Sequence, residues 1–382
     1  MKKAYKVLFA FGTRPEAIKM APVIKTFIED KTFDVKIVLT AQHREMLDQV
    51  LSIFKIKGDY DFNIMINRQS LEFVTTTIIK KFSEILENEK PDLVFVHGDT
   101  TSTFSCALGS FYKSIPVAHI EAGLRSNDLR NPFPEELNRR FADNLSTLHF
   151  CPTKIAKNNI INENIISRGI FVTGNTVVDA LNKIISTSKI NAKTNKEKGI
   201  KTILMTMHRR ESVGIPIASV SKAVKEVIEE NPDCELIFPV HKNPAVRDIV
   251  YPILGKRDRI QLIEPLDYIS FIKVMNQSYL VLSDSGGIQE EAPTLRKPVL
   301  LTRELTERPE GITSGVVKLI GTDYKNVKRE LTKLIRDTET YNEMISSKNP
   351  FGDGFASNRI LHFVKDYFNF NDSNISNPGE FE

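Results

Sequence analysis

Short runs of apolar, β-favouring residues alternate with longer stretches of helical periodicity along almost the whole chain. The first run, residues 7–11, precedes a segment in which Ala17, Ala21, Ile24 and Ile28 fall on one helix face. Similar runs follow at 36–39, 93–96, 116–120 and 148–151. They contain few polar residues, as do strands that are buried on both faces of a parallel sheet. The alternation predicts an α/β fold of the doubly wound type.

The same rhythm restarts after a polar interval at residues 186–198, which is rich in Lys, Asn, Thr and Ser. Later strands are expected at 203–206, 236–240, 260–263, 280–282 and 299–301. Because 382 residues exceed one ordinary core, we predict two Rossmann-like domains, at 1–172 and 173–355. A C-terminal helix at about 356–370 is expected to pack back on the first domain, and residues 371–382 to form a flexible tail. A (β/α)8 barrel is the alternative, although the chain is long for one and has a polar break at its middle.

Composition and charge exclude several classes of protein. The net charge of +4 comes without dense Lys/Arg blocks interleaved with aromatic residues, which argues against nucleic-acid binding. The N-terminus lacks a signal-peptide core, and no apolar run approaches the length of a membrane span. The three cysteines are scattered without CxxC spacing, as expected for buried reduced thiols. We therefore expect a cytoplasmic protein that binds neither membranes nor nucleic acid.

The segment Asp-Ser-Gly-Gly-Ile-Gln-Glu-Glu at 284–291 follows a predicted strand and opens a predicted helix. Ser285 is a good N-cap, and Gly286 and Gly287 leave the backbone N–H groups accessible to a ligand. Unpaired N–H groups at a helix N-terminus bind anions, above all phosphate. Glu291, six residues after Ser285, is placed to reach a neighbouring ribose hydroxyl. The plain alternative is an ordinary capped helix.

The loop after the first strand carries two cations. Thr13 and Glu16 have the spacing of a capping box, and Pro15 suits a first helical turn. Arg14 then lies at the mouth of the loop, with Lys19 about one turn further along the helix. Each cation taken alone is equally well explained as a solvated charge.

Ionisable residues also follow other predicted strands, where ligands of open α/β sheets bind. They are Asp99, Glu121, His208 and His241. Glu135 and Arg139 are spaced i,i+4 and share a helix face, which by itself is consistent with a surface salt bridge. The chain lacks Walker, GxGxxG, HExxH and GxSxG motifs, so neither a catalytic metal nor a cofactor is expected. What remains is general acid–base chemistry on a phosphorylated ligand.

Ten blocks of sequence closely resemble the non-hydrolysing bacterial UDP-N-acetylglucosamine 2-epimerases, and they span nearly the whole chain in one order. The blocks are GTRPEAIKMAP (12–22), TAQHREMLDQV (40–50), VHGDTT (96–101), HIEAGLR (119–125), PEELNR (134–139), VTGNTVVDAL (172–181), HRRES (208–212), DSGGIQEEAP (284–293), TERPEG (306–311) and NPFGDG (349–354).

The resemblance implies a glycosyltransferase-B arrangement, in which two Rossmann-like domains face a central cleft. It also implies interconversion of UDP-N-acetylglucosamine (UDP-GlcNAc) and UDP-N-acetylmannosamine (UDP-ManNAc). In the family's route the C2 proton is removed, UDP leaves C1, a glycal remains, and UDP re-adds while a proton reaches the opposite face of C2. The product feeds surface polysaccharides such as capsules. A homodimer and activation by a second UDP-GlcNAc are further implications.

Residue roles carried over from the family fall into three groups. The acid–base candidates are Asp99, Glu121 and Glu135, with His208 near the diphosphate and the sugar. The substrate-binding candidates are Arg14, Lys19, Ser285, Gly286, Gly287 and Arg308 for the diphosphate, Glu291 for the ribose, Leu266 and Phe271 for the uracil, and Arg139. The activator site would use Gln42, His43, Arg68, Gln69, Glu135 and His241.

Few positions depart from the family pattern. Arg130 and Asn131 stand where relatives usually carry Tyr-Ser, Phe133 where Trp is common, and Arg296 where Gly is usual. Arg130 and Asn131 lie in the segment that the resemblance places near the activator. Four alternatives stay open: a hydrolysing epimerase, a 2-epimerase of a UDP-diacetamido-uronic sugar, a glycosyltransferase of the same fold, and a catalytically silent nucleotide-sugar sensor.

Overall fold

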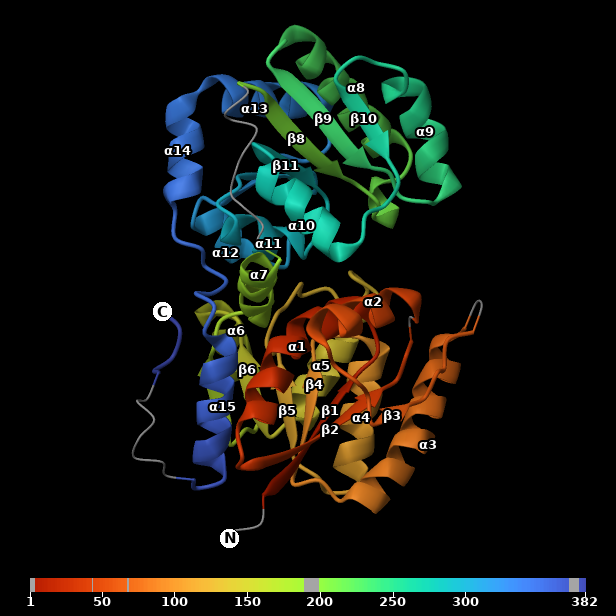
Figure 1. Ribbon diagram of the computed structural model, residues 1–382, viewed down its shortest axis with the longest axis vertical. Coiled ribbons are helices and arrows are strands. Elements are labelled where there is room, and N and C mark those ends of the chain that lie inside the picture. Colours follow the sequence, from red (N-terminus) through yellow and green to blue (C-terminus); the bar gives the residue numbers. More distant parts are fainter. Residues whose placement is uncertain (1–3, 43, 67–68, 189–198, 371–377) are drawn as a thin grey trace. The chain divides into compact units, whose positions relative to one another are not determined.

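A computed structural model describes residues 4–42, 44–66, 69–188, 199–370 and 378–382 (Figure 1). The chain divides into two compact units. The first consists of Met1–Lys183 together with Phe351–Glu382, and the second is Ile184–Pro350. Each unit is built on a parallel sheet of its own.

The sheet of the first unit has seven strands in the order β3-β2-β1-β4-β5-β6-β7. Their bounds are β1 Tyr5–Phe11, β2 Phe33–Leu39, β3 Tyr60–Asp61, β4 Leu93–His97, β5 Val117–Ile120, β6 Leu148–Cys151 and β7 Gly169–Val172. The direction of strand addition reverses at β1, which pairs with both β2 and β4. In doubly wound sheets this reversal opens a crevice at the carboxyl ends of the strands.

Helices connect these strands on both sides of the reversal. They are α1 Arg14–Glu29, α2 Glu45–Phe54, α3 Leu71–Glu89, α4 Thr101–Tyr112, α5 Glu135–Leu145, α6 Lys154–Asn162, α7 Thr176–Thr187 and the C-terminal α15 Ala356–Tyr367. Helices α3, α4 and α5 pack side by side, whereas α1 packs against α2 and α15 (Figure 1).

The second unit repeats the plan with a six-stranded sheet in the order β10-β9-β8-β11-β12-β13. Its strands are β8 Lys201–Thr206, β9 Cys234–Pro239, β10 Ile260–Ile263, β11 Leu280–Ser283, β12 Val299–Leu301 and β13 Val317–Leu319. Its helices are η2 Arg210–Ser212, α8 Ile215–Glu230, α9 Pro244–Leu254, α10 Tyr268–Gln277, α11 Ile288–Thr294, α12 Pro309–Thr313, α13 Tyr324–Arg336 and α14 Thr338–Ser346. The reversal here lies between β8 and β11.

The central strands of both sheets are buried on both faces. Every residue of β4, β5, β6 and β11 is buried, and the rings of Phe9 and Phe95 stack at 4.4 Å between neighbouring strands β1 and β4. The prediction of a doubly wound α/β fold is therefore confirmed, and two open sheets replace the alternative of a closed barrel. Within the described ranges, no helix is both long and apolar enough to cross a membrane.

The end of the chain returns to the first unit, which continues to Lys183 instead of ending at 172. The reason lies in α7, because the backbone N–H of Asn175 donates to Phe351 O (2.6 Å) and the Asp179 carboxylate accepts from the N–H groups of Ala356 and Ser357. The expected flexible tail, residues 371–382, is described only at 378–382. There Phe381 N–H donates to Val172 O at 2.8 Å, while residues 371–377 of that tail lie outside the described ranges.

Candidate active site

Loops that follow β1 and β4 are joined at the carboxyl edge of the first sheet by one buried carboxylate. Glu16 Oε2 accepts hydrogen bonds from Gly12 N–H (3.1 Å) and Thr13 N–H (2.7 Å), and Oε1 accepts one from Thr100 Oγ1 (2.7 Å). Burial raises the pKa of Glu16, and these hydrogen bonds act in the opposite direction. The helix start predicted from Thr13 and Glu16 is confirmed, and it places Arg14 as the first residue of α1, partly exposed at this edge.

Glu121 lies directly after β5 in a strained conformation. Its φ of +64° belongs to the left-handed region that residues other than glycine rarely occupy, and such strain collects at functional sites. The carboxylate is only 8% exposed; Oε2 contacts Lys19 Nζ and accepts from Asn175 Nδ2 at 2.8 Å. A Cβ built on Gly98 would lie 3.6 Å from Glu121 Oε1, so this carboxylate also lies beside the loop after β4.

Asp99 follows Gly98 in that loop and has its own cation. Its carboxylate contacts Arg139 Nη2, and its backbone oxygen accepts from Asn138 Nδ2 at 3.0 Å. Arg139 is buried and also donates to Glu136 Oε2 at 2.7 Å. Arg139 therefore orients Asp99 from α5, whose first residue, Glu135, is half-buried.

A buried hydrogen-bond network holds the loop that carries Gly98 and Asp99. His119 Nδ1 lies 2.7 Å from Asp143 Oδ1, and His119 Nε2 lies 2.7 Å from the carbonyl oxygen of Gly98. Arg125 Nη1 donates to the other Asp143 oxygen at 2.7 Å. Burial would raise the pKa of Asp143, but the charges and hydrogen bonds of His119 and Arg125 outweigh it and lower the pKa. The network holds the backbone that leads into Asp99.

In the second unit, Asp284 joins the loops after β11 and β8. This fully buried carboxylate accepts from the backbone N–H groups of His208 (2.9 Å) and Arg209 (3.0 Å) through Oδ2. The imidazole of His208 is 47% exposed and stacks on the ring of His241, with centroids 5.7 Å apart. The structure thus places His208, predicted to lie near the diphosphate and the sugar, beside His241, which is predicted for the activator site.

The turn at residues 284–287 corrects one prediction. Helix α11 begins at Ile288 with Gly287 as its N-cap, so Ser285 is not the cap. The reason is that Ser285 N–H donates to Ser283 Oγ (3.0 Å), which continues the strand into a turn before the helix starts. Among the described residues, none accepts a hydrogen bond from the N–H groups of Gly286, Gly287 or Ile288. These three donors are available to an anion.

Three arginines surround one carboxylate next to this turn. A Cβ built on Gly286 would lie 2.9 Å from Arg308 Nη1, 3.0 Å from Glu307 Oε1 and 3.3 Å from Arg209 Nη2. Burial would raise the pKa of Glu307, but the charges of Arg308, Arg303 and Arg209 outweigh burial and lower it to about 2. Arg308, whose Nε also donates to the buried Glu290 Oε1 at 2.5 Å, and Arg209 thus lie beside the same glycine turn as the N–H donors.

The segment at the start of α10 carries the two residues predicted to contact the uracil, and it also contacts Glu291 of α11. Tyr268, the first residue of α10, donates its hydroxyl to Glu291 Oε1 at 2.9 Å and so fixes the carboxylate predicted for the ribose. Leu266 precedes this helix and Phe271 lies in its first turn, and both side chains are partly exposed. The two predicted uracil contacts therefore come from the segment that orients Glu291.

The residues predicted for an activator site are only partly brought together. Gln69 Nε2 donates to Gln42 O at 3.1 Å, and Ser102 Oγ donates to Gln42 Oε1 at 3.0 Å. His43 and Arg68 lie outside the described residues. Glu135 belongs to α5 of the first unit and His241 to the second unit.

Sequence reasoning missed the residues that hold the predicted ones in place. Asn175 holds Glu121, Tyr268 holds Glu291, and Asp284 holds the loop of His208. Asn175 and Asp284 stand inside the motif blocks VTGNTVVDAL and DSGGIQEEAP, which was the available signal. Nothing in the sequence singles out Tyr268.

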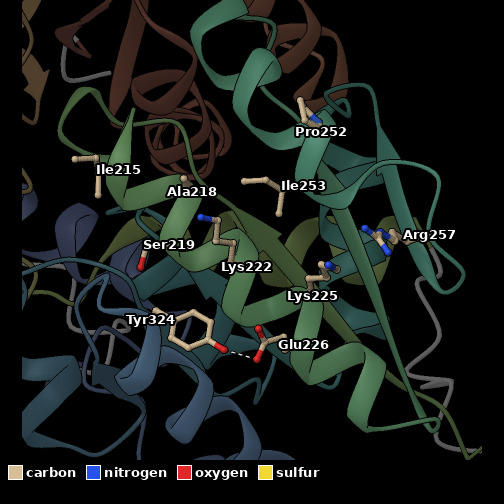
Figure 2. A pocket seen from close by; sticks show the side chains of 10 residues that line it. All are labelled: Ile215, Ala218, Ser219, Lys222, Lys225, Glu226, Pro252, Ile253, Arg257 and Tyr324. Atoms are coloured by element: carbon tan, nitrogen blue, oxygen red, sulfur yellow. Dashed lines mark hydrogen bonds between the residues drawn. The ribbon is translucent and has the colours of Figure 1, made fainter.

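A pocket of about 790 Å³ lies elsewhere in the second unit, between α8, α9 and the start of α13 (Figure 2). Figure 2 shows Lys222, Lys225 and Arg257 on its wall, with Glu226 bonded to the hydroxyl of Tyr324. It contains none of the predicted site residues.

Comparisons with known proteins agree with this arrangement. A family described as UDP-N-acetylglucosamine 2-epimerase matches residues 25–365. The UDP-N-acetylglucosamine 2-epimerase of Salmonella typhimurium is 47% identical over 371 residues, covering 95% of this chain and 99% of the relative. The solved UDP-GlcNAc 2-epimerase of Neisseria meningitidis, bound to UDP-GlcNAc, is 48% identical, with a TM-score of 0.87 over 94% of this chain and all of that chain. The solved complex of S. aureus MnaA with UDP is 47% identical, with a TM-score of 0.90 over 99% of this chain and all of that chain. The chain belongs to the UDP-N-acetylglucosamine 2-epimerase family.

Proposed function

We propose that the protein interconverts UDP-GlcNAc and UDP-ManNAc without hydrolysing them. A base removes the C2 proton, the bond between C1 and the UDP oxygen breaks, and a glycal and UDP remain. UDP then re-adds to C1 while an acid returns a proton to the other face of C2. The observation that carries this proposal is a pair of carboxylates at the carboxyl ends of neighbouring strands. Glu121 contacts Lys19, and Asp99 contacts Arg139.

Two carboxylates suit this chemistry because the proton leaves one face of C2 and returns to the other. Glu121 and Asp99 follow neighbouring strands β5 and β4, and Glu121 lies beside Gly98. Glu135, at the start of α5, is the third acid–base group. Arg139 would act on the substrate indirectly, because its guanidinium orients the carboxylate of Asp99.

The second unit supplies the groups for UDP in this proposal. The hydroxyl of Ser285, the N–H donors at Gly286 and Gly287 and the guanidinium of Arg308 would bind the diphosphate, with His208 nearby and Arg14 and Lys19 supplied by the first unit. Glu291 would bind the ribose, and Leu266 and Phe271 the uracil. Support comes from the guanidinium groups of Arg308 and Arg209 beside Gly286 and from two relatives that were solved with UDP-GlcNAc and with UDP. Departing UDP carries negative charge, which such donors stabilise.

Regulation by UDP-GlcNAc at a second site is part of the proposal. The contact between Gln69 and Gln42 supports a shared role for these two residues. We also propose that the protein acts as a homodimer and supplies ManNAc units for surface polysaccharides, as the resemblance of its motifs implies.

Solvent-deuterium incorporation tests the reaction. Incubation with UDP-GlcNAc in D2O, followed by NMR, should give both sugar nucleotides deuterated at C2 without added metal or nicotinamide. Free ManNAc as the product would indicate hydrolysis, and UDP-ManNAc without deuterium would contradict proton abstraction.

Single carboxamide variants test the acid–base groups. Asp99→Asn, Glu121→Gln and Glu135→Gln should each lower turnover by about 10²-fold or more. Glu84→Gln, on the exposed face of α3, is the matched control and should keep full turnover. Near-normal activity in all three variants would refute the assignment.

A further inference from the structure

His97 is the last residue of β4, and its backbone is fixed on both sides. Its carbonyl oxygen accepts a hydrogen bond from Thr103 Oγ1 at 2.5 Å, and the next residue, Gly98, donates its N–H to Ile120 O at 2.9 Å. Since β4 borders the reversal of strand order, its carboxyl end lies where doubly wound sheets bind ligands. The position of His97 is therefore set by the same loop that carries Asp99.

The imidazole of His97 is buried without a hydrogen-bond partner. It is 3% exposed, and within the described part of the chain neither Nδ1 nor Nε2 is bonded. Buried polar groups in folded proteins almost always have a partner from the protein, from water or from a ligand. Two other histidines of this sheet, His119 and His149, have both ring nitrogens bonded.

The ring lies among the charged groups of the proposed site. Burial lowers the pKa of His97 to about 4, and the charges of Glu121, Lys19, His119 and Asp99 act on it. At neutral pH the imidazole is therefore uncharged, with one nitrogen that donates a hydrogen bond and one that accepts.

We propose that His97 is a positioning residue that binds the sugar of the substrate, at the base of the site formed by Asp99 and Glu121. A diphosphate offers only acceptor oxygens, so it would leave the accepting nitrogen of this ring without a partner. A hydroxyl or an acetamido group both donates and accepts, and so matches an uncharged imidazole. The choice of an amino-sugar nucleotide as ligand rests on the proposed function.

Binding measurements separate the sugar from the nucleotide. In His97→Phe the ring shape is kept and both hydrogen-bonding atoms are lost, so calorimetry should show UDP-GlcNAc bound about tenfold more weakly and UDP bound as in the wild type. His97→Gln keeps a hydrogen-bond donor and an acceptor, so its affinity for UDP-GlcNAc should fall less than that of His97→Phe. His149→Gln is the control, because its partners are internal; it should lower the unfolding midpoint without changing the ratio of the two affinities.

A second measurement needs no variant to fold. In wild-type protein with 15N-labelled histidine, the ring signals of His97 should shift on addition of UDP-GlcNAc and stay in place with UDP alone. Equal responses to both ligands, or an unchanged affinity ratio in the variants, would show that the ring holds only a buried water or packs in the core, and would overturn the proposal. If the wild type incorporates no deuterium at C2, the proposed reaction is wrong. The calorimetry and the NMR titration still test whether His97 binds the sugar, because neither depends on turnover.

Discussion

Glu307→Gln tests whether the arginine cluster beside the glycine turn depends on its single central carboxylate. The Glu307 side chain contacts Arg308, Arg303 and Arg209 and is 8% exposed. Its pKa falls from a reference of 4.5 to about 2, because the three positive charges outweigh burial. This lowering of the pKa corresponds to about 3 kcal/mol of favourable interaction in the folded state, at about 1.4 kcal/mol for each tenfold change in the proton affinity.

The sign of the pH dependence follows from the lowered pKa. The folded protein binds fewer protons at Glu307 than the unfolded chain does, so this contribution is complete above the unfolded pKa and is lost as the pH falls from about 4.5 towards 2. Glu307→Gln should therefore lower the free energy of unfolding by about 3 kcal/mol at pH 7 and by about 2 kcal/mol at pH 3.5.

Urea unfolding of the second unit, followed at both pH values, measures these differences. Glu304→Gln is the matched control, because Glu304 is an exposed carboxylate in the same loop, and its change should stay within about 0.5 kcal/mol. A loss of less than about 1 kcal/mol at pH 7, or an equal loss at both pH values, would refute the role given to the arginines.

Three further variants address stability, binding and regulation. Arg296→Gly should raise the free energy of unfolding by about 0.5–1 kcal/mol in urea unfolding, because Arg296 has a φ of +53° where glycine is unstrained; no gain would contradict this. Tyr268→Phe should weaken UDP binding about fivefold by calorimetry, since the hydroxyl fixes Glu291, whereas Tyr251→Phe on α9 should not change it. Starting from pure UDP-ManNAc, the reaction should accelerate on addition of UDP-GlcNAc, with a coupling of ~1–3 kcal/mol. Gln69→Ala should weaken that acceleration more than it weakens UDP binding, and wild-type kinetics without any response would exclude the activator.

The strands at the centre of each sheet can be predicted from sequence, and those at its edges mostly cannot. Burial on both faces selects unbroken apolar runs, as in β4 and β11. The missed strands are β3, β7 and β13, all at sheet edges and two to four residues long. Asp61 and Lys318 interrupt the apolar pattern in β3 and β13, whereas β7 is a run of three apolar residues after Gly169 that the prediction overlooked.

For the site, sequence predicts which residues gather at strand ends but not which of them pair. Glu121 meets Lys19 and Asn175, which are 102 and 54 residues away along the chain, and only the sheet order brings them together. The prediction for Ser285 failed for a local reason, because a cap preference cannot show that a turn precedes the helix.

The return of residues 351–382 to the first unit makes that unit discontinuous, and this sets an order on its biogenesis. A ribosome releases the whole of the second unit, residues 184–350, before the segment that completes the first. Until then Asp179 has no α15 to cap, and Asp30 has no Lys365 to pair with (2.6 Å in the folded chain). Because domains generally fold as units during synthesis, the N-terminal part of this chain must wait, incompletely covered, for its last helix. A circular permutant that begins at residue 351 would supply α15 first and remove the delay.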